Sequence, residues 1–420
     1  MPDPAKIHSN LAERLQVRGF GPAQPLRVIV QYKPGARAVA VMVDGITDTH
    51  HNYRLIPASA HTVEVNAVNA LSEREDIEMI WLDEPVHTLL DASLALIGVP
   101  AVWDAGFSGK GVKVAVIDTG VDPDHPDFAG RIERMKDFTG EGYSDGSGHG
   151  THVAGIIGGA GQASDGKYRG VAPECTLIAA KVLRGDGSGN MSDVMAGVEW
   201  AVQQGARILN LSLGGSGSSD GADALSVTCD AAVGRGAIVF VAGGNSGPGA
   251  STIGSPGAAK RVITVGATSK TDQVANFSSR GPTKDGRVKP DVCFPGVGII
   301  AARAQGTSMG SPQGNAYTSA SGTSMATPHA AGVGALLLQA VPGLSHDQIK
   351  EILMNTAKEL GYEPNAQGKG RADVFAAYTR AVGTPPQPTP PPAQPPAQGQ
   401  GCAAIVGSFL KMINKQSAGR

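Results

Sequence analysis

The sequence has few cysteines and no long hydrophobic run, and both absences narrow the class of protein. Its four cysteines lie far apart and form no Cys-x-x-Cys pair, so we expect free thiols rather than a zinc site or a disulfide framework. No stretch reaches about 18 consecutive apolar residues, so no membrane-spanning helix is predicted. The formal net charge is only −2, from 35 basic and 37 acidic residues, and neither half of the chain is strongly basic. We therefore expect neither a membrane nor a nucleic-acid partner.

A secretion signal is also absent from the pattern of the first residues. Residues 1–24 contain no continuous apolar core of the kind that signal peptides carry. We therefore expect a cytoplasmic location. Separately, the protein is expected to act as a monomer. An extracellular location is the alternative, if the true start of the chain lies elsewhere.

Glycine, in contrast, is abundant: its 58 residues favour a loop-rich enzyme over a helical bundle. At roughly 100–200 residues per domain, a chain of 420 residues can hold one large core and one smaller domain. Changes in composition divide the chain into five segments: an N-terminal arm (1–24), a small α+β domain (25–90), a large α/β domain (91–382), a Pro-rich linker (383–401) and a short C-terminal tail (402–420).

The small domain is predicted to consist of strands and one short helix. The strands are expected at 26–32, 52–57, 61–65 and 77–83, with the helix at 68–76. Residues 36–43 form a short apolar run that periodicity alone does not assign to helix or strand.

The large domain shows apolar strands that alternate with helices. Its strands are expected at 112–118, 176–183, 206–213, 237–243 and 261–267, and two of its helices at 192–205 and 223–236. The strands are continuously apolar rather than alternating, which is typical of parallel strands buried on both faces. We predict a doubly wound, mostly parallel α/β sheet, whose functional site lies at the carboxyl ends of the strands.

Four polar residues are candidates for that site. Asp118 ends the first strand of the large domain, although a single Asp there is more often a turn residue or a helix cap. His149 and His152 stand three apart at the start of a helix and so share a face, but no His-Glu-x-x-His pattern supports a zinc site. Asn245 follows a buried strand in a glycine-rich turn, where its amide could donate a hydrogen bond to an oxyanion.

The tetrad Gly-Thr-Ser-Met occurs twice and offers two candidate nucleophiles. Ser308 matches the Gly-x-Ser-x-Gly elbow, but residues 311–315 read as a turn instead of the helix that an elbow requires. That fold also needs an acid between the serine and a later histidine, and the sequence has none before His346. Ser324 opens a long apolar helix in which Pro328 is expected in the first turn. An ordinary N-cap serine is the alternative for Ser324, but free backbone N–H groups there would also stabilise an oxyanion.

Taken together, these residues stand in blocks that resemble the subtilisin-like serine proteases, or subtilases. The matching blocks are VAVIDTGVDPDHPDF, GHGTHVAGIIGG, YRGVAPECTLIAAKVL, LNLSLGG, SPGAAKRVITVGA, FSSRGP, KPDVCFPG and SGTSMATPHAAG, all within about 100–380. The order Asp–His–Ser is also that of subtilisin. The resemblance implies a catalytic triad of Asp118, His149 and Ser324, with Asn245 as the oxyanion donor.

The resemblance further implies a self-processing zymogen. Residues 25–90 look like the family's inhibitory propeptide, an α+β domain of ferredoxin-like type that would act as an intramolecular inhibitor, with cleavage near Leu90. The lack of a signal resembles the intracellular alkaline-protease branch. No cofactor is expected for the chemistry; structural calcium is left open, because residues 158–173 lack the Asn-rich ligand loop of many secreted members.

The substrate is expected to be a protein or peptide chain that binds as an added strand, read mostly through its backbone. The residues expected to bind it are Gly187, Ser188, Gly189, Ser212, Leu213, Gly214 and Gly243. Two alternatives are a catalytically inactive scaffold used for binding and an esterase with the same triad.

Overall fold

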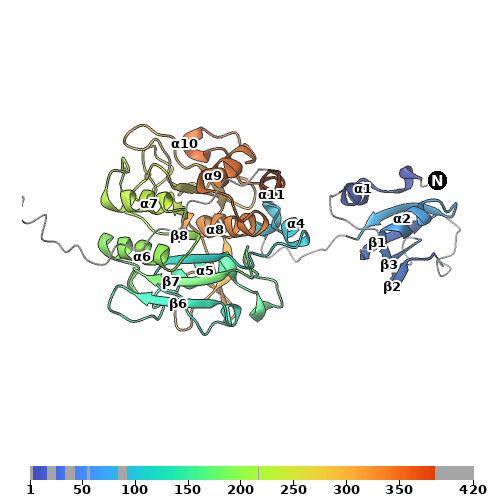
Figure 1. Ribbon diagram of the computed structural model, residues 1–420, viewed down its shortest axis with the longest axis horizontal. Helices are drawn as coiled ribbons and strands as arrows, with labels where there is room; N and C mark the ends of the chain where they lie inside the picture. The colour runs from blue at the N-terminus through green and yellow to red at the C-terminus, as the bar shows by residue number, and fades with distance from the viewer. Residues whose placement is uncertain are drawn as a thin grey trace, which may run out of the picture. The chain divides into compact units, whose positions relative to one another are not determined.

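The computed structural model describes residues 3–16, 25–33, 43–53, 57–83, 92–215 and 217–383. The chain divides into two compact units, Met1–Thr88 and Leu89–Arg420 (Figure 1). The Pro-rich linker and C-terminal tail expected after residue 383, and the expected cleavage point near Leu90, lie outside the described residues.

The N-terminal unit contains an antiparallel sheet of four strands in the order β2-β3-β1-β4. Its elements are η1 (Pro4–Lys6), α1 (Ser9–Gln16), β1 (Pro25–Tyr32), β2 (Ile46–Asn52), β3 (Ala58–Glu64), α2 (Val65–Ser72) and β4 (Ile77–Leu82). Alternate residues of β1, among them Val28 and Val30, are fully buried and pack with Leu71 and Ile80 into a small core. Helix α2 connects β3 to β4, as in the second half of a β-α-β-β-α-β unit.

Two predictions for this unit were wrong in position. The strand expected at 52–57 overlaps β2 only at Asn52, where β2 ends, and residues 54–56 lie outside the described residues; the helix expected at 68–76 is α2, which begins at Val65 and ends at Ser72. Strand β2 lies at the edge of the sheet, and its sequence ITDTHHN has no apolar alternation that would reveal a strand. Most of the ambiguous run 36–43 lies outside the described residues.

The C-terminal unit is built on a sheet of seven strands in the order β11-β10-β9-β8-β5-β7-β6. The strands are β5 (Lys113–Asp118), β6 (Ile132–Asp137), β7 (Thr176–Lys181), β8 (Ile208–Leu211), β9 (Ile238–Ala242), β10 (Ile263–Thr268) and β11 (Val292–Pro295). Every neighbouring pair is parallel. All residues of β8, β9 and β10 are buried, which explains their continuous apolar sequences and confirms the predicted doubly wound α/β class.

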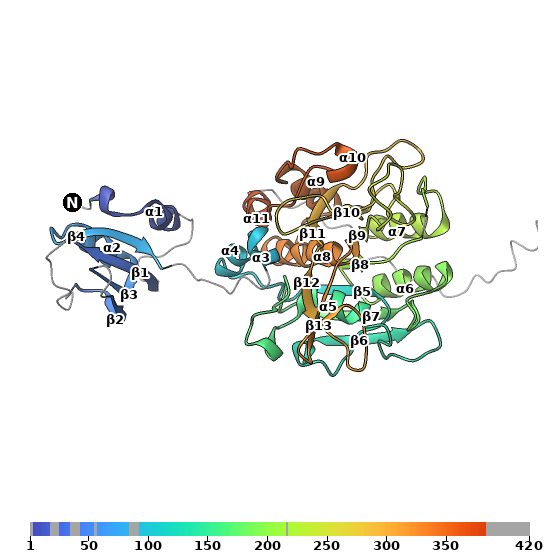
Figure 2. The same cartoon turned by 180° about the vertical axis from the view of Figure 1, so that it is seen from behind.

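Helices cover both faces of this sheet (Figures 1 and 2). One face packs against α6 (Met191–Gln203) and α7 (Ala224–Gly234), through a core that includes Trp200 and Cys229. The other packs against α5 (His149–Gly158) and α8 (Thr323–Ala340). Helix α8 is buried almost all round and contacts β8, β9, β10 and β11, so it forms the centre of the larger core.

The remaining elements surround this core. A small antiparallel sheet of order β12-β14-β13 packs on α5 through β12. The elements are α3 (Ala92–Leu96), α4 (Val99–Asp104), η3 (Pro126–Phe128), η4 (Gln162–Ser164), β12 (Ile299–Ala302), β13 (Ser311–Gln313), β14 (Tyr317–Ala320), α9 (His346–Asn355), α10 (Pro364–Gln367) and α11 (Val374–Val382). In the described part of the chain, no helix has the length and apolarity needed to span a membrane.

The strand order fixes where a site can form. After β5 the chain builds β6 and β7 on one side, and then crosses to build β8 to β11 on the other. The chain therefore leaves the neighbouring strands β5 and β8 toward opposite edges of the sheet, which opens a crevice at their carboxyl ends. Asp118 ends β5, Ser212 follows β8 and Gly243 follows β9, so all three lie at this edge.

Candidate active site

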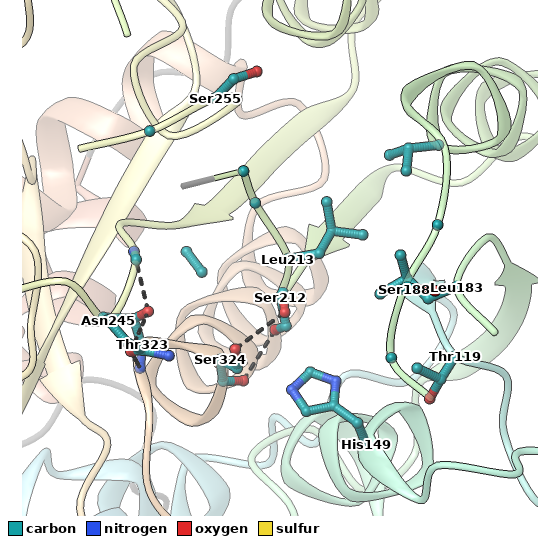
Figure 3. A pocket seen from close by; sticks show the side chains of 18 of the residues that line it. Thr119, His149, Leu183, Ser188, Ser212, Leu213, Asn245, Ser255, Thr323 and Ser324 are labelled. Atoms are coloured by element: carbon teal, nitrogen blue, oxygen red, sulfur yellow. Dashed lines mark hydrogen bonds between the residues drawn. The ribbon is translucent and has the colours of Figure 1, made fainter. Parts of the chain in front are cut away.

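Asp118 and His149 form the most direct contact at this edge of the sheet. Asp118 is fully buried, and its Oδ1 accepts hydrogen bonds from the Thr119 backbone N–H at 2.8 Å and from His149 Nδ1 at 2.6 Å. The His149 side chain is 22 % exposed, and Figure 3 shows its ring turned toward Ser324. Since the carboxylate holds Nδ1, the other ring nitrogen, Nε2, is left to exchange a proton on the open side.

The environment of His149 sets its proton affinity. Burial by itself would lower the pKa of His149, but the charge and hydrogen bond of Asp118, together with the charge of Asp145, outweigh it and leave the pKa raised. The imidazole is therefore a stronger base than a free histidine.

Asp145 ties together the segments that carry Asp118 and His149. It is buried, and its Oδ1 accepts from Thr119 Oγ1 and the Gly148 N–H, both at 2.8 Å. Its Oδ2 accepts from the N–H and Oγ1 of Thr151 at 2.8 and 2.6 Å. Both carboxylate oxygens are thus used, and the start of α5 is held against the end of β5.

Glycines on both sides of His149 allow this close packing. Gly148 caps α5 with φ +88°, a left-handed conformation that favours glycine. A Cβ on Gly150 would overlap the carbonyl oxygen of Gly120, so a side chain there would push α5 away from the Asp118 turn.

Ser324 lies in the first turn of α8, and its contacts differ from those expected. The helix begins at Thr323 with Gly322 as its N-cap, and no side chain caps it, so Ser324 is not the N-cap. The Ser324 hydroxyl donates to the Ser212 carbonyl oxygen at 3.1 Å (Figure 3). Pro328 lies in the second turn rather than the first, so it provides no N–H for the Ser324 carbonyl oxygen. The Ser212 hydroxyl donates to that oxygen instead, at 3.0 Å.

Asn245 is oriented by the residue beside Ser324. Its Oδ1 accepts from the Thr323 N–H at 2.8 Å and from Thr323 Oγ1 at 3.0 Å (Figure 3). A backbone N–H can only donate, so the amide oxygen must face Thr323 and the Nδ2 donor must face the other way. The first turn of α8 thereby fixes a hydrogen-bond donor close to Ser324.

These side chains surround one cavity of about 770 Å³. His149, Asn245 and Ser324 line it, while Asp118 lies buried behind His149. All of the residues expected to bind substrate also line it: Gly187, Ser188, Gly189, Ser212, Leu213, Gly214 and Gly243. The structure therefore brings Asp118, His149, Ser324 and Asn245 together with the residues expected to bind substrate, around a cavity large enough for several residues of a peptide.

Comparison with known proteins decides the family. Residues 109–370, more than half of the chain, match the sequence pattern described as the Subtilase family. The chain belongs to the subtilase family. It is 38% identical over 407 residues to the serine protease AprX of Bacillus subtilis (strain 168), an alignment that covers 88% of this chain and 90% of AprX. It is 37% identical over 332 residues to subtilisin E of the same organism, covering 77% of this chain and 81% of that protein.

A solved structure agrees with this assignment. The crystal structure of a cold adapted subtilisin-like serine proteinase superposes with a TM-score of 0.52 at 37% sequence identity, covering 63% of this chain and 88% of that one. The subtilase fold predicted from the sequence is confirmed, and the protein is a serine-type endopeptidase of this family that needs no cofactor for its chemistry.

His152 does not join the site of this subtilase, although the sequence places it on the same helix face as His149. Its Nε2 bonds to the carbonyl oxygens of Ile299 and Thr318, both at 3.1 Å, so the ring faces the small sheet. Burial lowers the pKa of His152 to about 4, which keeps the ring neutral. Among the described residues, no group of three or more His, Cys, Asp or Glu side chains is arranged to hold a metal ion.

Ser308 is exposed between β12 and β13 and is not among the residues that line the cavity. No helix follows it, as predicted, but residues Ser311–Gln313 form strand β13 where a turn was expected. Cys175, Cys229 and Cys293 are free, buried thiols, as predicted from their spacing.

Several residues that shape the site of this subtilase were not predicted from the sequence. Asp145 stands four residues before His149 in the same glycine-rich block. That position near His149 is the feature of the sequence that could have identified Asp145 as a site residue. Lys181 is a lone charge in an apolar strand; it is almost fully buried, and its Nζ donates to the carbonyl oxygens of Thr119 and Leu183 at 2.9 and 3.0 Å. Met309 also lines the cavity, and no pattern around it predicted this.

Proposed function

We propose that Ser324, His149 and Asp118 form a catalytic triad that cleaves peptide bonds through an acyl-enzyme. The observation that carries this proposal is the 2.6 Å hydrogen bond between Asp118 and His149, beside a cavity that Ser324 lines. Asp118 holds the imidazole in the tautomer whose Nε2 can accept a proton, and it stabilises the charged form that results.

The reaction starts with a change of partner for the serine. The Ser324 hydroxyl, which donates to Ser212 in the free protein, turns toward His149 Nε2 when a substrate takes the Ser212 backbone as its own partner. His149 accepts the proton as Ser324 Oγ attacks the peptide carbonyl carbon. His149 then donates that proton to the leaving amine, and water repeats the sequence to release the acyl group.

The developing oxyanion is stabilised by Asn245 Nδ2 and by the backbone N–H of Ser324. The orientation of the Asn245 amide supports this role, because Thr323 occupies its oxygen. Ser324 also lies in the first turn of α8, where backbone N–H groups have no partner within the helix and the dipole is positive. Both donors are fixed before the reaction, so little reorganisation accompanies charge development.

The substrate chain binds as an added strand between residues 187–189 and residues 212–214. Both segments line the cavity, and they follow β7 and β8 in the chain. Backbone hydrogen bonds dominate such binding, so cleavage is broadly specific.

A fluorophosphonate probe followed by peptide mapping tests the nucleophile. Labelling is expected at Ser324, with Ser324→Ala unlabelled and inactive, while Ser308→Ala, at the exposed serine of the other tetrad, keeps labelling and casein cleavage. Labelling at Ser308 would overturn the assignment, and no labelling would favour a binding scaffold. Cleavage of activated esters without cleavage of casein would favour an esterase.

We also propose that residues 25–90 are an intramolecular inhibitor that the protease removes from itself. The compact four-stranded unit with its own core supports this proposal, since a separately folded domain can be released whole. Incubation of the purified chain should yield a smaller species by mass spectrometry, and Ser324→Ala should stay intact. An intact chain that still cleaves casein would contradict self-processing.

A further inference from the structure

We propose that Met309 is a specificity-determining residue that favours substrates with an apolar residue directly after the scissile bond. Met309 belongs to the first Gly-Thr-Ser-Met tetrad, whose serine the proposed chemistry does not use. The inference rests on the proposed function, because it takes Ser324 and His149 as the centre of the reaction. The segment 303–310 that carries Met309 is called the 303–310 loop.

The 303–310 loop is braced by its own hydrogen bonds. Arg303 Nη2 donates to the Thr307 carbonyl oxygen at 2.7 Å, and Thr307 Oγ1 donates to the Ala304 carbonyl oxygen at 2.8 Å. Gly306 and Gly310 turn the backbone on either side of Met309, with φ of +78° and +70°. The loop therefore has a defined shape.

Contacts with neighbouring segments hold both ends of the loop. The Gln305 N–H donates to Asp122 Oδ2 at 3.0 Å, in the segment that follows β5. The Met309 carbonyl oxygen accepts from Thr318 Oγ1 at 2.8 Å, in strand β14. The loop is thus fixed to two segments that also bond to α5, on which β12 packs (Figure 2).

The loop approaches the residue immediately before His149. A Cβ built on Gly148 would lie 2.6 Å from Thr307 Oγ1 and 3.5 Å from the Met309 Cβ. The backbone of Gly148 therefore packs directly on the loop. Met309 itself is partly buried and lines the cavity together with Ser147, His149 and Ser324.

This position places Met309 on the side of the cavity that receives the leaving group of the substrate. His149 protonates the leaving amine, so the residues after the scissile bond must pass close to its ring. Figure 3 shows the His149 ring beside Ser324, with Ser255 at the far end of the same cavity, and Met309 belongs to the His149 side because it packs next to Gly148. The acyl part of the substrate lies along residues 212–214 instead.

The chemistry of methionine defines the preference. Its thioether side chain is apolar, polarizable and has three rotatable bonds, so it adapts to apolar partners of different shape. An apolar residue after the scissile bond buries surface against Met309, whereas glycine gains nothing there and a carboxylate or ammonium loses hydration.

The test uses internally quenched peptides that differ only in the residue after the scissile bond, which is Leu, Gly or Arg. The cleaved bond is verified by mass spectrometry, and kcat/KM is measured for the processed enzyme. Met309→Ala should lower the Leu-to-Gly ratio of kcat/KM by about tenfold, the scale of a lost apolar contact in a pocket. Met309→Leu should restore the ratio to within about twofold, because volume-conserving apolar replacements are tolerated.

Met309→Glu should increase the relative cleavage of one substrate, which misfolding of the variant would not do. It should raise the Arg-to-Leu ratio by about tenfold or more, since a carboxylate beside the cavity attracts a basic residue. Ser308→Ala is the matched control, exposed and next in sequence, and should leave every ratio unchanged. Unchanged ratios in Met309→Ala and Met309→Glu would overturn the inference.

A peptide p-nitroanilide, which has no amino acid after its scissile bond, separates this inference from the proposed function. Hydrolysis that requires Ser324 supports the proposed function whatever the Met309 ratios show. If the unaltered processed protein hydrolysed neither the anilide nor the peptides, the triad assignment would fail, and this inference with it.

Discussion

Asn245 gives a sharp test of the oxyanion site, because its two polar side-chain atoms have different hydrogen-bonding roles. Oδ1 accepts two hydrogen bonds from Thr323, and Nδ2 is the donor left for the substrate. Asn245→Ala removes both functions, whereas Asn245→Asp keeps an acceptor for Thr323 and removes only the donor. Comparison of the two variants separates stabilisation of the transition state from support of α8.

The expected loss of kcat is that of one oxyanion donor, because the backbone N–H of Ser324 stays in place. Removal of one preorganised oxyanion donor costs about 2.7–4 kcal/mol, or about 10²–10³ in kcat, a figure measured in another subtilase. KM should change little, because the donor binds charge that develops only in the transition state. Asn245→Asp should lose at least as much, since its carboxylate would also repel the oxyanion. Its fold should persist, because an anion near the start of a helix is favourable.

The assay is steady-state hydrolysis of a peptide p-nitroanilide, with kcat and KM determined separately and folding followed by circular dichroism. If Asn245 acted only by holding Thr323, Asn245→Asp would keep nearly full kcat and Asn245→Ala would not. That pattern, or a rise in KM with kcat unchanged, would refute the assignment of Asn245 as an oxyanion donor.

Three further predictions concern the support of the triad. The raised pKa of His149 should place the acidic limb of the kcat/KM profile above the ordinary histidine pKa of about 6.5, since only the neutral ring accepts a proton. Asp118→Asn removes the partner that raises this pKa, so the residual activity, about 10⁴-fold lower, should have its limb at lower pH; a limb that stayed in place would contradict this electrostatic origin. Ser212→Ala, made in the inactive Ser324→Ala background, should lower the free energy of unfolding in urea by about 0.5–1.5 kcal/mol, because the partly buried Ser324 carbonyl oxygen loses its donor. Gly150→Ala should lower both thermal stability and activity, because its Cβ would overlap a neighbouring backbone carbonyl; unchanged melting and kcat would show that α5 yields freely.

The sequence predicted best where burial alone determines the pattern. Strands β8, β9 and β10 are buried on both faces, so their apolar residues are continuous and their boundaries lay within a few residues of the structure. The position of strand β2 was not predicted, for the opposite reason. It is an edge strand whose pairing with β3 is decided by backbone hydrogen bonds, and its polar side chains carry no record of them.

Contacts between distant segments account for what the sequence missed in the site. The rule that Pro belongs in the first turn misplaced the start of α8, because it assumes that a carbonyl oxygen freed by Pro328 has no other donor. The Ser212 hydroxyl, 112 residues earlier in the chain, supplies that donor. The proline therefore does not break the helix there, and the same exchange links the turn that carries Ser324 to the end of β8.

The two Gly-Thr-Ser-Met tetrads show how far a short motif depends on the structure that surrounds it. In the second, α8 begins at the threonine, whose N–H and hydroxyl both bind Asn245, and this brings the serine to the cavity. In the first, no helix comes next; the threonine instead packs on Gly148, the serine is exposed, and the methionine reaches the cavity. The same four residues thus offer Ser324 as the candidate nucleophile and Met309 as a contact for the leaving group. Their spacing in the chain says nothing of this, because the helix and the loop, rather than the tetrad, decide which side chain faces the substrate.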